Sequence, residues 1–282
     1  MSKGARLRPF LLVAFPAAFL FVFFVLPNAF LLAASFLKSD AQMLTDERTL
    51  ENYGFLFGRP LYRAAMVRTF VVGGLVGALV VILSYPLAFF LARTTSKWKG
   101  ALTALALTPL LASVVVRTYG WWVLLNRDGA LNDLLRAFGI TDSPLVMLPS
   151  VGAIVIGLTH SLLPFGVLTI MSALNGINPN LERAALSLGA SRTRTFLAVT
   201  LPLSAGGVVG GFLLAFALAI SAYATPTILG GPATETMATL IYKFMVSLMD
   251  WSIGSALGTM LILSSMALIA IGTALGARRN TV

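Results

Sequence analysis

Six long apolar runs constrain the fold of this chain more than any other feature. They lie near residues 9–37, 64–92, 101–125, 149–172, 203–230 and 252–276. Each is long enough for the roughly 20 residues that a helix needs to cross a bilayer. Charged residues make up only 11% of the chain, whereas soluble proteins carry about 25%. The sequence therefore predicts an all-α membrane protein with about six transmembrane helices, forming a single domain over residues 1–282.

Basic residues are distributed unevenly between the two sides of this topology. One side carries a single acid, Glu182, and the following basic residues: Lys3, Arg6, Arg8, Arg93, Lys97, Lys99, Arg183, Arg192, Arg194, Arg278 and Arg279. Elsewhere the basic and acidic residues balance, so the net charge of +10 lies on one face. The positive-inside rule places both termini, the 93–100 loop and the 173–202 loop in the cytoplasm. We interpret the excess as topology and contact with anionic membrane lipid, with no nucleic-acid partner.

The cytoplasmic segment 181–202 has the pattern of two short helices joined at a glycine. Residues at i, i+3, i+4 and i+7 form one face of the first helix: Leu181, Ala184, Ala185 and Leu188. Asn178 is placed to cap this helix, and Gly189 is the residue type expected just past its end. Ser191 begins a second short helix that we expect to stop before Pro202. We interpret the segment as a docking element between membrane spans.

Residues that catalysis or metal binding would need are scarce. The chain has no cysteine and one histidine, which excludes thiolate sites and imidazole clusters. It contains no P-loop, zinc-protease or nucleophile-elbow motif. His160 lies within an apolar run, where an ionisable group is either functional or hydrogen-bonded to a neighbouring helix. Arg68 and Arg117 lie near the ends of predicted spans, where arginine extends toward the headgroups. We therefore expect neither an enzyme nor a metal site.

Aromatic and acidic residues gather in the predicted outer segments, together with several bases. The candidate substrate-pathway residues among them are Arg117, Tyr119, Trp122, Tyr223, Asp250 and Trp251. Ring faces and carboxylates hold cationic amines, each cation–π contact contributing roughly 0.5–2 kcal/mol. Arg117, Arg127, Arg136 and Lys243 would instead attract an anionic or zwitterionic solute. The residues alone leave both solute classes open.

The 181–202 segment resembles the EAA loop of permease subunits in ATP-binding-cassette importers, whose pattern is roughly E-A-A-x-x-x-G followed by I-x-L-P. Matching positions are Ala184, Ala185, Gly189, Val199 (for Ile), Leu201 and Pro202. The glutamate position of the pattern holds Arg183, and Glu182 stands one residue earlier. Other stretches are similar to the spermidine/putrescine branch of these permeases: Asn52-Tyr53, residues 117–122, residues 129–132, residues 224–232 and residues 250–256.

This resemblance implies a type I importer permease in a bacterial inner membrane, with residues 173–202 as the coupling loop. The implied coupling residues are Leu181, Glu182, Arg183, Ala184, Ala185, Leu188, Gly189, Leu201 and Pro202. The implied partners are a second homologous permease, a substrate-binding protein and two ATPase subunits, which hold ATP and Mg while this chain binds no cofactor.

The implied mechanism is alternating access, and the implied solute is a polyamine such as putrescine or spermidine. Two alternatives stay open. The same machinery could import another small solute, such as an amino acid derivative, a phosphonate or another organic anion. A protein of another class, a membrane scaffold that binds a cytosolic partner, could also carry such a loop.

Overall fold

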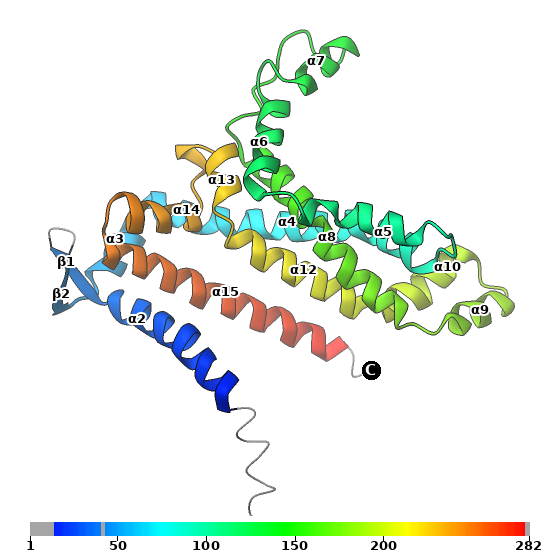
Figure 1. The fold of residues 1–282 in the computed structure, drawn as a ribbon, viewed down its shortest axis with the longest axis horizontal. Helices are drawn as coiled ribbons and strands as arrows, with labels where there is room; N and C mark the ends of the chain where they lie inside the picture. Colours follow the sequence, from blue (N-terminus) through cyan, green and yellow to red (C-terminus); the bar gives the residue numbers. More distant parts are fainter. Residues whose placement is uncertain (1–13, 41–42, 280–282) are drawn as a thin grey trace, which may run out of the picture. The chain divides into compact units, whose positions relative to one another are not determined.

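The computed structural model describes residues 14–40 and 43–279, and their regular secondary structure is helical apart from one short hairpin (Figure 1). The chain divides into two compact units. The first comprises the residues up to Arg63 together with Leu240–Met266, and the second comprises Ala64–Thr239 with the residues from Ala267 onward. Both predicted cytoplasmic termini fall in segments outside the described residues, so that placement stays a prediction.

The first unit joins a β-hairpin to apolar helices. Its elements are a π-helical turn (Phe21–Val25), α2 (Leu26–Ala34), β1 (Leu37–Asp40), β2 (Met43–Arg48), α3 (Glu51–Gly58), a second π-helical turn (Lys243–Ser247) and the start of α15 (Trp251–Arg279). The strands are antiparallel, with Leu37 opposite Arg48. Buried Asn52 donates to the carbonyls of Ser35 and Leu37, both at 2.9 Å, and thereby ties α3 to the hairpin. The hairpin and α3 together fill the polar segment between the first two apolar runs.

The second unit holds most of the helices. They are α4 (Pro60–Arg93), α5 (Lys99–Leu107), a 3-10 turn (Thr108–Leu110), α6 (Val114–Leu125), α7 (Ala130–Ala137), α8 (Val151–Asn175), α9 (Pro179–Ser187), α10 (Arg192–Thr195), a π-helical turn (Phe196–Thr200), α11 (Leu201–Leu203), α12 (Ala205–Ile220), α13 (Ala224–Leu229), a 3-10 turn (Pro232–Thr234) and α14 (Met237–Tyr242), whose last residues belong to the first unit. Helices α9 and α10 lie near one end of α8, and the projecting segment formed by α6 and α7 leaves near the other (Figure 1).

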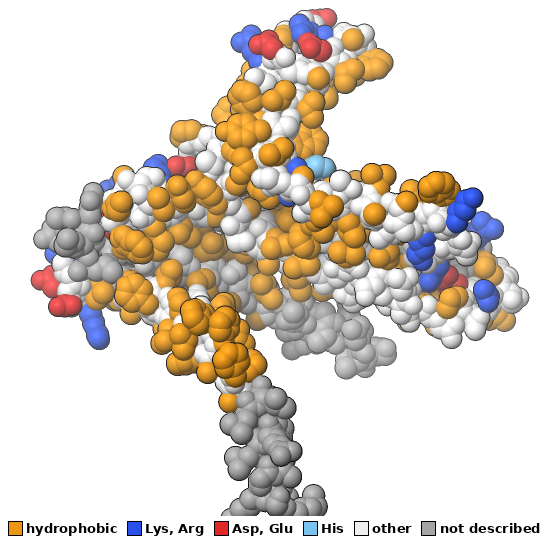
Figure 2. All heavy atoms as spheres, in the orientation of Figure 1, with side chains coloured by type: hydrophobic (Ala, Val, Ile, Leu, Met, Phe, Trp, Pro, Cys, Tyr) orange, Lys and Arg blue, Asp and Glu red, His pale blue; other side chains and the backbone are white. Residues whose placement is uncertain are grey.

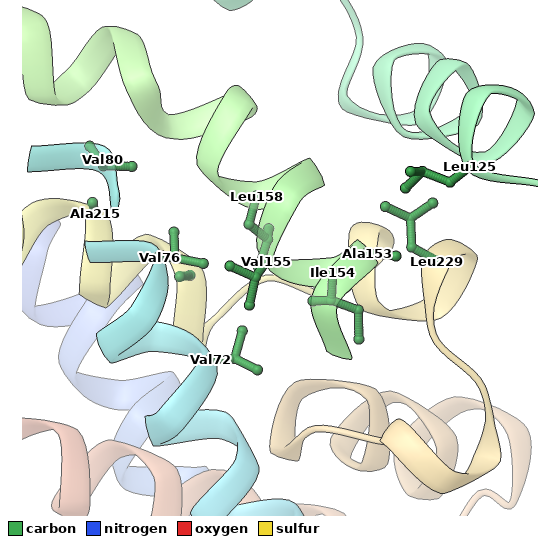
Figure 3. Packing of buried hydrophobic residues seen from close by; sticks show 11 residues of the cluster. Val72, Val76, Val80, Leu125, Ala153, Ile154, Val155, Leu158, Ala215 and Leu229 are labelled. Carbon is green, nitrogen blue, oxygen red and sulfur yellow. The ribbon is translucent and has the colours of Figure 1, made fainter. Parts of the chain in front are cut away.

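The core of the second unit lies where α4, α8, α12 and α13 meet. Val72, Val76 and Val80 recur every four residues and therefore form one buried stripe along α4. This stripe belongs to one cluster with Ile154 and Leu158 of α8 (Figure 3). Leu229 of α13 and Leu125 at the end of α6 extend the cluster toward α7 (Figure 3).

Glycine lets the helices of the second unit approach closely. A Cβ atom at Gly77 of α4 would lie 2.9 Å from the Phe212 ring and 3.2 Å from its carbonyl oxygen, on α12. A Cβ atom at Gly207 of α12 would collide with Ala173 of α8. Both glycines belong to small-residue pairs spaced four apart, a pattern that favours close helix packing in lipid. By contrast, Gly74 faces open space.

Four described helices are long and apolar enough to cross a membrane, and two bent pairs raise the number to as many as six. The long helices are Ala14–Ala34, Pro60–Arg93, Val151–Asn175 and Trp251–Ala270. The predicted span 101–125 is wrong as one straight helix, because the chain bends by 87° between Leu110 and Val114. The predicted span 203–230 is also too long, since α12 ends at Ile220 and α13 is separate.

Candidate functional site

Helix α9 has the ends that its sequence predicts. The Asn178 side chain accepts a hydrogen bond of 3.0 Å from the Asn180 amide, and Pro179 occupies the first turn. At the other end, the Gly189 amide donates to Leu186 at 3.0 Å and the Ala190 amide to Ala185 at 3.1 Å. Gly189 has φ +87°, the left-handed conformation that glycine adopts without strain. The predicted glycine turn between the two short helices is therefore confirmed.

The second helix of the loop does not stop where predicted. The Ser191 side chain caps it by accepting from the Arg194 amide at 3.3 Å, as expected. The helix then continues through the π-helical turn Phe196–Thr200 and includes Pro202. A π-turn shifts the hydrogen-bond partners by one residue, so the missing amide of proline is accommodated without ending the helix. The break falls instead at buried Ser204, whose hydroxyl is 2.8 Å from that of Tyr85, and the following helix is bent by 61°.

Most of the predicted docking face of α9 is exposed. Leu181 is 48% and Leu188 89% accessible, and Ala184 is exposed between them. Ala185 differs because it is half-buried. Lysine and arginine side chains gather at this end of the second unit (Figure 2). The face therefore combines apolar side chains with a basic surrounding.

Glu182 points away from that face and binds the rest of the unit. Its Oε1 lies 2.6 Å from Nη2 of Arg93 at the end of α4 and accepts a hydrogen bond of 2.9 Å from the Thr200 hydroxyl. Arg93 also donates to the Leu174 carbonyl of α8 at 3.1 Å. Sequence reasoning missed Arg93 and Thr200, because nothing local pairs them with Glu182. These three side chains line a pocket of about 650 Å³ beneath α9. Exposed Arg183 bonds only locally among the described residues, donating to the Asn180 side chain at 3.3 Å.

The predicted pathway residues fall in both units. Arg117, Tyr119 and Trp122 lie on α6, and Tyr223 immediately precedes α13, which packs against α6. Asp250 and Trp251 belong to the first unit instead. The Asp250 carboxylate accepts from the Ile253 amide at 3.2 Å and from the Ser252 hydroxyl at 3.0 Å. Asp250 therefore caps the start of α15, and its predicted place in the substrate pathway stays a prediction.

Two polar contacts join α6 to α8. Nη1 of Arg117, which is half-buried, donates to the Ser161 carbonyl at 3.4 Å. Nε1 of Trp121, one turn later, donates to Nδ1 of His160 at 3.2 Å. His160 is thus hydrogen-bonded to a neighbouring helix, one of its two expected environments. Within the described ranges, no three His, Asp or Glu side chains are grouped to hold a metal ion.

Comparison with known proteins identifies a family and several relatives of this chain. Residues 53–280 match the model of the family described as the binding-protein-dependent transport system inner membrane component. The chain is 32% identical to the spermidine/putrescine transport system permease protein PotB of Salmonella typhimurium over 84% of its own length and 82% of that protein. It shares the same identity with Escherichia coli PotB, covering 86% of that protein.

The fold is also that of solved importer permeases. A crystal structure of a bacterial alginate ABC transporter, in complex with an alginate pentasaccharide-bound periplasmic protein, superposes with a TM-score of 0.80 at 16% identity. The alignment covers 99% of this chain and 97% of that one. The predicted fold class is confirmed. The chain belongs to the binding-protein-dependent transport system inner membrane components, the permease subunits of ABC importers, and is a multi-pass inner-membrane protein.

Proposed function

We propose that this chain forms half of the translocation pathway of an ATP-driven importer and works by alternating access. The observation that carries this proposal is the two-sided construction of α9. Its outer face exposes Leu181, Ala184 and Leu188, while its inner face is held to α4 and the π-helical turn through Glu182. A helix that must transmit a partner's movement needs both an accessible face and a firm attachment to the spans.

The outer face is our proposed contact with the ATPase subunit. Because Glu182 is engaged internally with Arg93, we assign the polar contact with the ATPase to Arg183, which is exposed. The Gly189 turn holds α9 at a fixed angle to the helix that begins with α10. Leu201 and Pro202 continue this second helix toward the bend at Ser204. Movement of α9 would then reach both α4 and α12.

The proposed partners are two ATPase subunits, a second homologous permease and a substrate-binding protein. ATP and Mg belong to the ATPase subunits in this scheme, and the permease itself needs no cofactor. The family description, which names a binding-protein-dependent system, and the alginate transporter solved with its periplasmic protein support these partner kinds. The relatives named for spermidine and putrescine make an amine the first solute class to test.

A reconstituted complex tests the importer function directly. We expect ATP hydrolysis by the co-purified ATPase to rise only when the binding protein and its solute are both present. A membrane scaffold that merely binds a cytosolic partner would give hydrolysis independent of solute, and that result would reject the importer proposal.

The docking face is tested by Ala184→Glu. The added carboxylate would be stranded in an apolar contact, so we expect a loss of several kcal/mol in docking, on the order of that seen at interface hot spots. The measurement is the amount of ATPase subunit that co-purifies with the permease. Thr95→Glu, which adds the same charge to an exposed loop position on the same side, is the control and should leave the complex intact. Equal recovery of the ATPase with both variants would contradict the assignment.

A further inference from the structure

The pocket beneath α9 is large enough to hold a small ligand. Its volume of about 650 Å³ falls within the range of small-molecule sites, roughly 300–1,000 Å³. It is bounded by α9, the end of α4, α10 and the π-helical turn that follows. Glu182 and Leu186 line it, so it lies on a different face of α9 from the proposed ATPase contact. The proposed coupling uses the walls of this pocket and leaves its interior unassigned.

Two residues of the lining carry a buried polar atom that has no hydrogen-bond partner among the described residues. These atoms are Nε of Arg93 and Oγ1 of Thr195. Arg93 uses its two other nitrogens for the Leu174 carbonyl and the Glu182 carboxylate. The Thr195 side chain belongs to a residue that is only 5% exposed. Because nearly all buried polar groups in proteins are hydrogen-bonded, both donors are available to a ligand.

The charge around the pocket is positive. Glu182 is balanced by Arg93, at 2.6 Å. Arg192 also lines the pocket and is exposed, and none of the ion pairs between described residues includes it. A cation would therefore meet two guanidinium groups. An anion with several acceptor oxygens, such as a phosphate group, complements this set of donors.

The rest of the lining is apolar. Phe89, Leu186 and Phe196 contribute it, and the two rings meet edge to face with centroids 5.7 Å apart. These walls favour a phosphate that carries an apolar portion over an inorganic ion. An anionic phospholipid has both parts. Basic side chains also gather at this end of the second unit (Figure 2), as they do on protein surfaces that attract anionic lipid.

We infer that this pocket binds a phosphate group through the Arg93 Nε, the Thr195 hydroxyl and the Arg192 guanidinium. The two buried atoms are covered in this structure, so binding includes a rotation of their side chains. Threonine in a helix has two accessible χ1 rotamers, and the Thr195 hydroxyl has no existing hydrogen bond to break. A bound phosphate would join α4 to α10 and stiffen the coupling loop.

Binding is measured as a rise in the thermal unfolding temperature of the full-length permease in an uncharged detergent. The added compounds are phosphatidylglycerol, phosphatidylcholine and glycerol phosphate. We expect phosphatidylglycerol to raise the unfolding temperature saturably. Phosphatidylcholine, in which choline balances the phosphate charge, should have little effect.

Three variants locate the site. Arg192→Gln and Thr195→Val should each raise the half-maximal concentration of phosphatidylglycerol about tenfold, as loss of one charge-assisted hydrogen bond would. Arg194→Gln removes the same charge from an exposed position of α10 outside the lining, and should leave that concentration unchanged. In the absence of lipid, Thr195→Val should unfold at no lower temperature than the parental protein, because its hydroxyl has no partner.

Glycerol phosphate identifies the source of the phosphate. Binding of the lipid alone assigns the pocket to a headgroup, and equal binding of glycerol phosphate assigns it to a soluble phosphate compound. Equal weakening by Arg192→Gln and Arg194→Gln would show diffuse charge attraction and overturn the site. An unfolding temperature that none of the compounds changes would do the same. None of these measurements needs the ATPase or a transported solute, so their failure would leave the proposed importer function standing.

Discussion

At the scale of single residues, Gly189 is the position where backbone conformation alone decides what is tolerated. It has φ +87°, and no atom lies within 4 Å of where a Cβ would be. Gly189→Val should therefore cost roughly 1–2 kcal/mol through backbone strain without any clash. We expect the variant to enter the membrane but to import solute poorly, because the turn no longer holds α9 and α10 at their native angle. Solute uptake by proteoliposomes measures this effect.

Gly189→Asn is the matched comparison, since asparagine tolerates the left-handed conformation better than valine does. It should retain most of the parental uptake. Parental uptake by the valine variant would show that the angle of the turn does not matter.

The residue scale also shows what sequence could and could not reveal at the coupling loop. Asn178, Ser191 and Gly189 were predictable because a cap or a turn depends on neighbours only a few residues away. The partners of Glu182 were not, because Arg93 is 89 and Thr200 18 residues distant in sequence. Charge pattern placed Arg93 and Glu182 on one side of the membrane without indicating that they touch.

At the scale of elements, the ion pair between Glu182 and Arg93 attaches α9 to α4. Both side chains are only about one-fifth exposed, at 19% and 21%. Such a pair lies between exposed and buried cases, so Glu182→Gln should weaken this attachment by on the order of 1–3 kcal/mol. Faster hydrogen exchange in α9 and α10 would report it. We expect Arg93→Gln to act similarly and the double variant to be no worse than either single one.

The pair between Asp133 and Arg136 provides the control. It has the same 2.6 Å separation but is 62% and 44% exposed, so Asp133→Asn should leave exchange in α7 nearly unchanged. Additive effects of the Glu182 and Arg93 variants would mean that the two side chains stabilise α9 independently.

The π-helical turn explains why one element boundary escaped prediction. Proline at position 202 predicts the end of an α-helix, because its ring and missing amide disrupt the α-helical bonding pattern. The chain inserts a wider turn at Phe196–Thr200 and continues. Local propensity does not reveal such a turn, since Thr200 is held within it by a contact with Glu182 on another helix.

At the scale of the whole molecule, the stability of the permease should depend on the close contact between α4 and α12. Gly77→Val would press into the Phe212 ring and its carbonyl, and overpacking of this kind costs about 1–3 kcal/mol. The expected result is a lower thermal unfolding temperature of the purified permease in detergent. Gly74→Val, on the same helix but facing open space, controls for the change in helix propensity. Equal unfolding temperatures for the two variants would refute tight packing at Gly77.

The membrane class and approximate number of spans follow from hydrophobic length, because every backbone polar group in lipid must be satisfied within a helix. The bends at residues 111–113 and at Ser204 do not follow from length. They depend on tertiary contacts such as the bond between Ser204 and Tyr85. The same holds for the contact between Arg117 and the Ser161 carbonyl, which is visible only once α6 is placed against α8.

The contact between Arg117 and Ser161 also has a consequence for how the chain is made. An arginine within an isolated apolar helix costs up to roughly 2.5–3.5 kcal/mol to insert, and the hydrogen-bond acceptor of Arg117 is synthesised 44 residues later. Helix α6 therefore leaves the ribosome before the helix that receives its charge exists. We therefore expect the stable integration of α6 into the bilayer to be complete only after α8 has been made, so that the two helices settle in the lipid together.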